Sequence, residues 1–229
     1  MEMIRSQIDR PDFVLLTGDL SQDGSTASYE ALSTMLTPLE TPLYWLPGNH
    51  DSLETMLVAL DQKPFHQDKD FQRGNWRFLL LNSQIPGQVP GHLSAAVLDR
   101  LAEALAQQPD VPTTIAFHHP PLTLATTWLN QSALQNPDEL FAILDRFPQV
   151  KLVLFGHIHQ AIVHERKGVT YLGTPSTCIQ FATQGNNFAL DEGQHPGFRE
   201  LLLYPDGTWQ TTVHRVNVHL TPDLTSTGY

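Results

Sequence analysis

Four short segments rich in metal-binding side chains, each directly after an apolar run, constrain this chain more than any other feature. They are Thr17-Gly18-Asp19, Gly48-Asn49-His50-Asp51, His118-His119-Pro120 and Gly156-His157-Ile158-His159. Aspartate, asparagine and histidine side chains bind hard to borderline divalent cations, and no thiolate lies among them. Ligands of open α/β sheets gather beyond the carboxyl ends of the strands. Four such segments in series therefore indicate a metal-centred active site.

The composition fits one α/β domain over residues 1–229 that ends in a polar tail over 217–229. Hydrophobic residues make up 41% of the chain, enough for a sizeable core. Cys178 is the only cysteine, so an intramolecular disulfide is excluded and a reducing compartment is favoured. Apolar runs such as 78–81 are too short to span a membrane. We therefore expect a cytoplasmic protein without a membrane partner.

The charge balance excludes one class of partner. Asp and Glu number 24 against 13 Lys and Arg, the net charge is −11, and basic residues form no cluster. A nucleic-acid polymer is therefore not an expected partner. A small phosphate ester stays open as a substrate, because bound divalent cations would be the largest charges in the site.

Strand and helix patterns alternate along the first two thirds of the chain. Apolar runs predict strands over 12–17, 43–46, 76–82, 113–117 and 151–155, with 76–82 at the centre of the sheet. Helical spacing predicts helices over 29–39 and 95–106. A third helix is expected to start at Asn136, which has Pro and Glu at the favoured positions after it, and Asp51 is expected to cap a helix over 52–60.

The last third carries no helical pattern. Two hairpins are expected, one over 161–172 turning at Lys167-Gly168 and one over 199–216 turning at 205–207. Strand–helix units followed by antiparallel pairs predict a layered α/β fold.

The ligand types suggest different positions around cations. The Asp19 carboxylate can bridge two ions, Asn49 offers a neutral carbonyl oxygen, and His118, His157 and His159 offer ring nitrogens. His119 is an alternative to His118, and the sequence leaves both open. Each segment alone has an ordinary explanation, as a turn, a helix cap or a rigid loop. Together they favour a metal site.

The motifs resemble those of the calcineurin-like metallophosphoesterases, whose signature contains Gly-Asp, Gly-Asn-His-Asp and Gly-His-x-His. Longer stretches narrow the resemblance to the bacterial class III 3′,5′-cyclic-AMP phosphodiesterases. These stretches are residues 18–25, 44–51, 156–160, 175–181 (Pro-Ser-Thr-Cys-Ile-Gln-Phe) and 189–191. The similarity runs from about residue 11 to 216. It implies a layered α/β/β/α sandwich.

The resemblance also implies residue roles. Asp19 would bridge two metal ions, Asn49, His118 and His157 would complete the second metal site, and His159 would bind the first metal. His50 would be catalytic, facing the phosphate and stabilising charge or protonating the leaving oxygen. Asn49, His50 and His159 would also contact the substrate.

The implied reaction is hydrolysis of 3′,5′-cyclic AMP to AMP by attack of metal-bound hydroxide on phosphorus. Manganese or iron are the expected ions, with zinc as an alternative. A broader phosphodiesterase acting on glycerophosphodiesters or 2′,3′-cyclic nucleotides is the alternative enzyme. Relatives often form dimers, so a homodimer is a further expectation.

One departure from the family pattern matters. The family begins with a strand ending in Asp-x-His, which supplies most first-metal ligands, and no such segment precedes Asp19. Residues 1–10 read instead as the end of the helix that follows that strand. We therefore expect a sandwich without its first strand. Either the sequence starts downstream of it, which the intact remaining motifs favour, or the chain is a one-metal, impaired nucleotide-binding relative.

Overall fold

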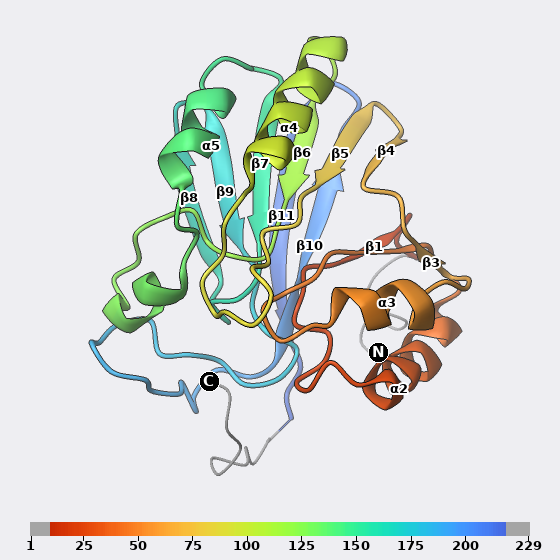
Figure 1. The fold of residues 1–229 in the computed structure, drawn as a ribbon, viewed down its shortest axis with the longest axis vertical. Coiled ribbons are helices and arrows are strands. Elements are labelled where there is room, and N and C mark those ends of the chain that lie inside the picture. Colours follow the sequence, from red (N-terminus) through yellow and green to blue (C-terminus); the bar gives the residue numbers. More distant parts are fainter. Residues whose placement is uncertain (1–9, 219–229) are drawn as a thin grey trace.

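The computed structural model describes residues 10–218, which form four layers around a central six-stranded sheet (Figure 1). The order of its strands is β4-β5-β6-β7-β9-β8. Their bounds are β4 Asp70–Arg73, β5 Trp76–Leu80, β6 Thr113–Ala116, β7 Val150–Phe155, β8 Ile162–Arg166 and β9 Val169–Gly173. The four inner strands β5, β6, β7 and β9 run parallel, and the edge strands β4 and β8 are antiparallel to their neighbours.

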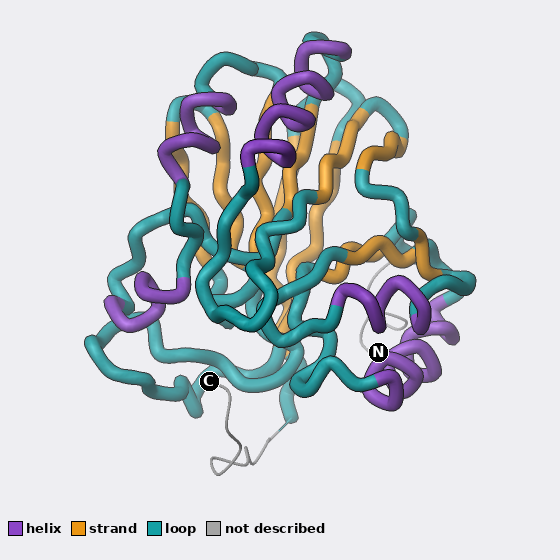
Figure 2. Tube along the Cα trace, in the orientation of Figure 1, coloured by secondary structure: helices purple, strands orange, loops and turns teal. Residues whose placement is uncertain are grey.

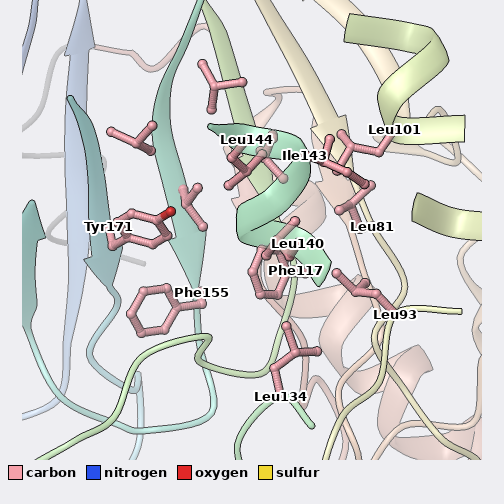
Figure 3. Close-up of a cluster of buried hydrophobic side chains, with 14 of the residues drawn as sticks. Leu81, Leu93, Leu101, Phe117, Leu134, Leu140, Ile143, Leu144, Phe155 and Tyr171 are labelled. Atoms are coloured by element: carbon pink, nitrogen blue, oxygen red, sulfur yellow. The ribbon is translucent and has the colours of Figure 1, made fainter. Parts of the chain in front are cut away.

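Two helices, α4 (Ala95–Gln107) and α5 (Pro137–Leu144), cover one face of this sheet (Figures 1 and 2). Alternate strand residues point to this face, because successive side chains of a strand lie on opposite sides. Phe117 lies there beside Leu140 of α5 (Figure 3), and Phe155 and Leu144 belong to the same core cluster. All four side chains are buried, so this layer forms the largest core cluster.

The other face of the central sheet packs on two smaller sheets. One is parallel and contains β1 (Val14–Leu16), β2 (Leu43–Trp45) and β3 (Phe65–His66). The other is the hairpin of β10 (Gly197–Leu203) and β11 (Trp209–Arg215). Leu80, Ala116, Leu152, Leu154 and Leu172 of the central sheet line the shared core.

The outermost layer consists of α2 (Thr26–Leu36) and α3 (Leu53–Ala59) with a short 3₁₀ helix, η1 (Thr37–Leu39). Tyr29 of α2 and Met56 of α3 pack on the outer face of β1 and β2, where they share a buried cluster with Trp45 of β2. A second 3₁₀ helix, η2 (Thr127–Ser132), lies in the loop between β6 and α5. The expected layered α/β/β/α fold is therefore confirmed.

Most predicted elements are present, including both hairpins, with two differences in the strands. β5 lies beside the edge strand β4 rather than at the centre of its sheet. The short strands β3 and β4 were not predicted, since neither carries a long apolar run. Within residues 10–218, β1 pairs with β2 alone, as expected for a sandwich without its first strand.

Asn136 is the N-cap residue of α5, as predicted, but its side chain has other partners, and the predicted Asp51 cap is wrong. The Asn136 side chain accepts from Leu93 N–H and donates to Leu93 C=O, at 3.0 and 2.9 Å, and makes no cap bond. Ser52, rather than Asp51, caps α3 by accepting from Thr55 N–H. Asp51 instead serves the site described below.

Two further expectations concern the chain ends and the membrane. Most of the expected helix end at 1–10 and of the tail at 217–229 lies outside the described residues. No helix within residues 10–218 is long and apolar enough to cross a membrane. The cytoplasmic location stays a prediction.

Candidate metal centre

The predicted ligand segments converge where the strand ends of two different sheets meet. Asp19 follows β1 in the small parallel sheet, and His118 and His157 follow β6 and β7 in the central sheet. Asp19 Oδ2 lies 3.0 Å from His118 Nε2, which lies 3.2 Å from His157 Nδ1. The His50 backbone N–H, after β2, donates to Asp19 Oδ1 at 3.0 Å. The expected grouping of Asp19, His118 and His157 is thus present in the geometry.

Hydrogen bonds on the far sides of the two imidazoles fix which nitrogen faces the centre. His118 Nδ1 donates to the Thr17 carbonyl at 2.7 Å, which leaves Nε2 pointing at Asp19. The Ser132 hydroxyl donates to Leu129 C=O at 3.0 Å and therefore accepts from His157 Nε2–H at 2.9 Å. His157 Nδ1 is then an acceptor. In metal sites, such hydrogen bonds fix the ring orientation and the tautomer of histidine ligands and raise their basicity.

The charges around this point also suit a cation. Burial alone would raise the pKa of Asp19, but His118 and the other nearby imidazoles hold it well below its ordinary value. Burial alone would lower the pKa of His118, but the charge of Asp19 outweighs it and raises that pKa. Burial and His118 lower the pKa of His157 far below its ordinary value. His118 Nε2 thus lies close to two acceptors, Asp19 Oδ2 and His157 Nδ1, and these three atoms would suit a cation.

His119 is also close, but both of its ring nitrogens already have protein partners. Nδ1 lies 2.8 Å from Ser83 Oγ, and Nε2 lies 3.0 Å from the Val89 carbonyl. A ligand atom of His119 still falls within 4.8 Å of those of His118 and His157. Burial lowers the pKa of His119 to about 3, so the ring is neutral. Both ring nitrogens of His119 are therefore bonded to Ser83 and Val89, whereas Nε2 of His118 faces Asp19.

Two further predicted ligands carry buried polar atoms with no hydrogen-bond partner in the described part of the chain. These atoms are Asn49 Oδ1 and His159 Nδ1. A buried polar atom left unsatisfied costs about 1–3 kcal/mol, so native proteins rarely keep one without a reason. Burial lowers the pKa of His159 to about 4, which keeps that ring neutral. A bound metal ion would give each of these atoms a partner, so both residues fit a metal site.

The backbone at three of these residues adopts the left-handed conformation. The φ angles are +53° at Asp19, +64° at His157 and +50° at His159. Non-glycine residues in this region cost about 1–3 kcal/mol each and cluster at functional sites. Ile158, between the two histidines, is fully buried in the core. The turning backbone thus lets His157 and His159 diverge instead of sharing one face.

Two glycines in the motifs are required by close packing. A Cβ on Gly48 would lie 2.1 Å from Asp19 Oδ1, and a Cβ on Gly18 would lie 2.4 Å from His118 Nδ1. Gly18 also has a φ of +93°. Both glycines let the backbone approach the proposed ligands directly.

Asp51 holds two of the ligand loops together, a role that the sequence did not reveal. Its carboxylate accepts from the backbone N–H groups of Leu20, Ser21 and Gly48 at 2.9–3.2 Å and from the Tyr29 hydroxyl at 2.9 Å. It thereby joins the loop after β1 to the loop after β2.

Two polar side chains complete the support of the site and were also missed. Gln84 donates to the carbonyls of Gly48 and Asp51, at 2.8 and 2.5 Å, and Ser132 holds His157. These contacts join segments far apart in the sequence, so no local motif could have indicated them.

Comparison with known proteins bears on the identity of this site. Among sequence models of protein families, calcineurin-like phosphoesterase matches residues 1–161. The chain belongs to the calcineurin-like phosphoesterase family. Members of this family use divalent metals, and the histidine cluster formed by His118, His119 and His157 could hold one. The predicted family and enzyme class are confirmed.

Curated relatives match along nearly the whole chain. A 3′,5′-cyclic-nucleotide phosphodiesterase of Nostoc sp. is 50% identical over 99% of this chain and 84% of the relative. The 3′,5′-cyclic adenosine monophosphate phosphodiesterase CpdA of Escherichia coli is 41% identical over 100% of this chain and 84% of the relative. Among solved structures, a dimetal phosphatase of Danio rerio gives a TM-score of 0.62 at 15% identity, covering 76% of this chain and 74% of that one. The last similarity supports the fold alone.

Proposed function

We propose that this chain is a metal-dependent phosphodiesterase that hydrolyses 3′,5′-cyclic AMP to AMP. The observation that carries the proposal is that His118 Nε2 lies 3.0 Å from Asp19 Oδ2 and 3.2 Å from His157 Nδ1. Relatives at 50% and 41% identity that are named as cyclic-nucleotide phosphodiesterases support the substrate class. The acidic net charge of the chain is no obstacle, because the cations would bind the phosphate.

The donor set suggests which residues would hold metal ions. Asp19, Asn49, His118 and His157 offer two oxygens and two nitrogens for one cation. This is the second metal site of the family pattern, and Asp19 and His159 would contribute to the first. When bound, such ions lower the pKa of water and neutralise charge on the phosphate. Manganese, iron and zinc all accept these ligands.

His118, rather than His119, is the proposed ligand. Its Nδ1 is occupied by the Thr17 carbonyl, so Nε2 is directed to the centre, whereas both nitrogens of His119 are occupied. His50 is proposed to stabilise charge on the phosphate or to protonate the leaving oxygen. Its backbone N–H holds the Asp19 carboxylate, which couples the two residues.

Loops from both the small parallel sheet and the central sheet contribute to this one centre, which supports the proposal of a single metallophosphoesterase domain. Asp19 and Asn49 come from one sheet and His118 and His157 from another. A homodimer and a cytoplasmic location stay predictions.

The test is hydrolysis of cyclic AMP by the metal-free protein after addition of manganese or ferrous iron. Parallel assays use 2′,3′-cyclic AMP and a glycerophosphodiester. The variants are His118→Asn and His50→Ala, and the matched control is His164→Asn, because His164 lies exposed on β8. We expect metal-dependent turnover that His118→Asn and His50→Ala abolish and His164→Asn retains.

The other outcomes separate the alternatives. Hydrolysis of the other diesters but not of cyclic AMP would contradict the proposed substrate. The proposed metal-dependent hydrolysis would still hold. About one bound ion per chain, with nucleotide binding and no turnover at any metal concentration, would contradict the enzyme proposal. It would favour the one-metal binding relative, in which the first metal site would have only Asp19 and His159 as ligands.

A further inference from the structure

A cluster of aromatic side chains contacts the proposed metal ligand His159. The His159 ring stacks on Phe181 with centroids 4.2 Å apart and planes 3° apart. Phe181 contacts Trp128 at 5.1 Å and Phe188 at 5.6 Å, and these two contact each other at 5.3 Å. The three rings Trp128, Phe181 and Phe188 are called the aromatic cluster below.

Two loops from different parts of the chain carry the aromatic cluster, and hydrogen bonds join them to the ligand segment. Gln160, directly after His159, donates to the Ala182 carbonyl at 2.7 Å and to Thr126 Oγ1 at 3.1 Å. Thr126 Oγ1 also donates to the Ala182 carbonyl, and Thr127 N–H donates to Gly185 C=O at 3.0 Å. The aromatic cluster is therefore placed relative to His159 by several polar contacts rather than by apolar packing alone.

The aromatic cluster contains a buried ring, which contacts His159, and an exposed ring. Phe181 is 5% exposed, whereas Phe188 is 44% exposed. The backbone beside both residues is paired, with Ala182 N–H donating to Ala189 C=O at 2.9 Å and an isolated bridge between Phe181 and Leu190. An exposed ring on a paired segment, backed by two other rings, offers a ready surface for stacking.

We propose that Phe188, backed by Phe181 and Trp128, stacks on the purine base of the cyclic nucleotide. This inference rests on the proposed function, because it places the phosphate at the metal centre beside His159. A cyclic nucleotide carries its base one ribose away from phosphorus, and one ring, Phe181, lies between His159 and Phe188. Aromatic side chains bind bases through their faces, so the site would select nucleotides over simple diesters.

The test compares ligands with and without the base on the manganese-loaded protein. Dissociation constants for AMP and ribose 5-phosphate are measured by calorimetry for the wild type, Phe188→Ala and Phe188→Tyr. Loss of base stacking is expected to weaken AMP binding about 5- to 150-fold in Phe188→Ala. Ribose 5-phosphate binding stays unchanged, and Phe188→Tyr keeps AMP affinity. Val163→Ala, at a 60%-exposed apolar side chain on β8, is the matched control.

The kinetic arm distinguishes this inference from the proposed function. KM for cyclic AMP is expected to rise in Phe188→Ala by the same factor, with kcat for a glycerophosphodiester unchanged. If cyclic AMP is hydrolysed and Phe188→Ala leaves both AMP affinity and KM unchanged, the base site is wrong and the phosphodiesterase stands. Equal weakening of AMP and ribose 5-phosphate would also overturn the base site. Base-dependent AMP binding without turnover would support the base site and overturn the phosphodiesterase.

Discussion

Replacing Asp51 with asparagine tests how the metal-centre loops are held. Four donors converge on this carboxylate, namely three backbone N–H groups and the Tyr29 hydroxyl. An asparagine side chain keeps one oxygen and turns the other into an NH₂ group. With NH₂ in place of Oδ2, which accepts from Gly48 N–H at 2.9 Å, two donors face each other. Placing it at Oδ1 instead disturbs Ser21 N–H and Tyr29 Oη.

The size of the expected loss of stability follows from the less damaging of these two orientations of the asparagine side chain. One buried N–H loses a charged acceptor, and hydrogen bonds to charged groups contribute about 1.5–3 kcal/mol. We therefore expect Asp51→Asn to lower the free energy of unfolding by about 2 kcal/mol or more. If Asp51 acted as a helix cap, asparagine would serve equally well and the change would be near zero.

Urea denaturation of Asp51→Asn, followed by far-UV circular dichroism, measures this difference at an unchanged m-value. Asp99→Asn, on an exposed position of α4, is the matched control and is expected to stay within about 0.5 kcal/mol of the wild type. Tyr29→Phe in a double-mutant cycle is expected to couple to Asp51→Asn by more than about 0.5 kcal/mol. An Asp51→Asn variant as stable as Asp99→Asn would refute the reasoning.

Three further predictions concern the site and its surroundings. Ser132→Ala frees His157 Nε2 and is expected to weaken manganese binding about 10- to 100-fold in calorimetric titration; an unchanged affinity would contradict the positioning role. Gly18→Ala forces a Cβ against His118 Nδ1, so kcat/KM for cyclic AMP is expected to fall about a hundredfold, and normal turnover would argue against this packing. Burial lowers the pKa of Lys69 to about 8 from 10.5, so between these values the unfolded state binds more protons than the folded one. The stability of the wild type relative to Lys69→Met should therefore rise from pH 8 to pH 10 in urea melts, and a fall would reverse the sign of the argument.

Local patterns could predict the elements and the ligand types, but not how the ligands pair. Apolar runs placed Asp19 and His118 at strand ends, which the structure confirms. That the two strands belong to different sheets depends on packing between layers, which leaves no periodicity in the sequence. The choice between His118 and His119 depends on the carbonyls of Thr17 and Val89, whose positions the sequence does not reveal.

The helix caps also show that residue type alone does not determine which partner a side chain finds. Asn136 has the residue type and spacing of a cap, yet its side chain pairs with the backbone of Leu93. Propensity states which partners a side chain accepts, and tertiary contacts decide which of them it finds. Asp51 differs from the prediction for the same reason.

The origin of the ligands in two sheets has a consequence for how the protein holds together. Asp19 follows a strand of the small parallel sheet and His118 follows a strand of the central sheet, and the two side chains lie 3.0 Å apart. An ion bound by both residues would link the two sheets. Its binding energy would then add to the stability of the folded state by mass action, about 1.4 kcal/mol for each tenfold excess over Kd. Movement of one sheet relative to the other would separate the two ligands. Metal affinity would therefore fall when the packing between the two sheets is loosened.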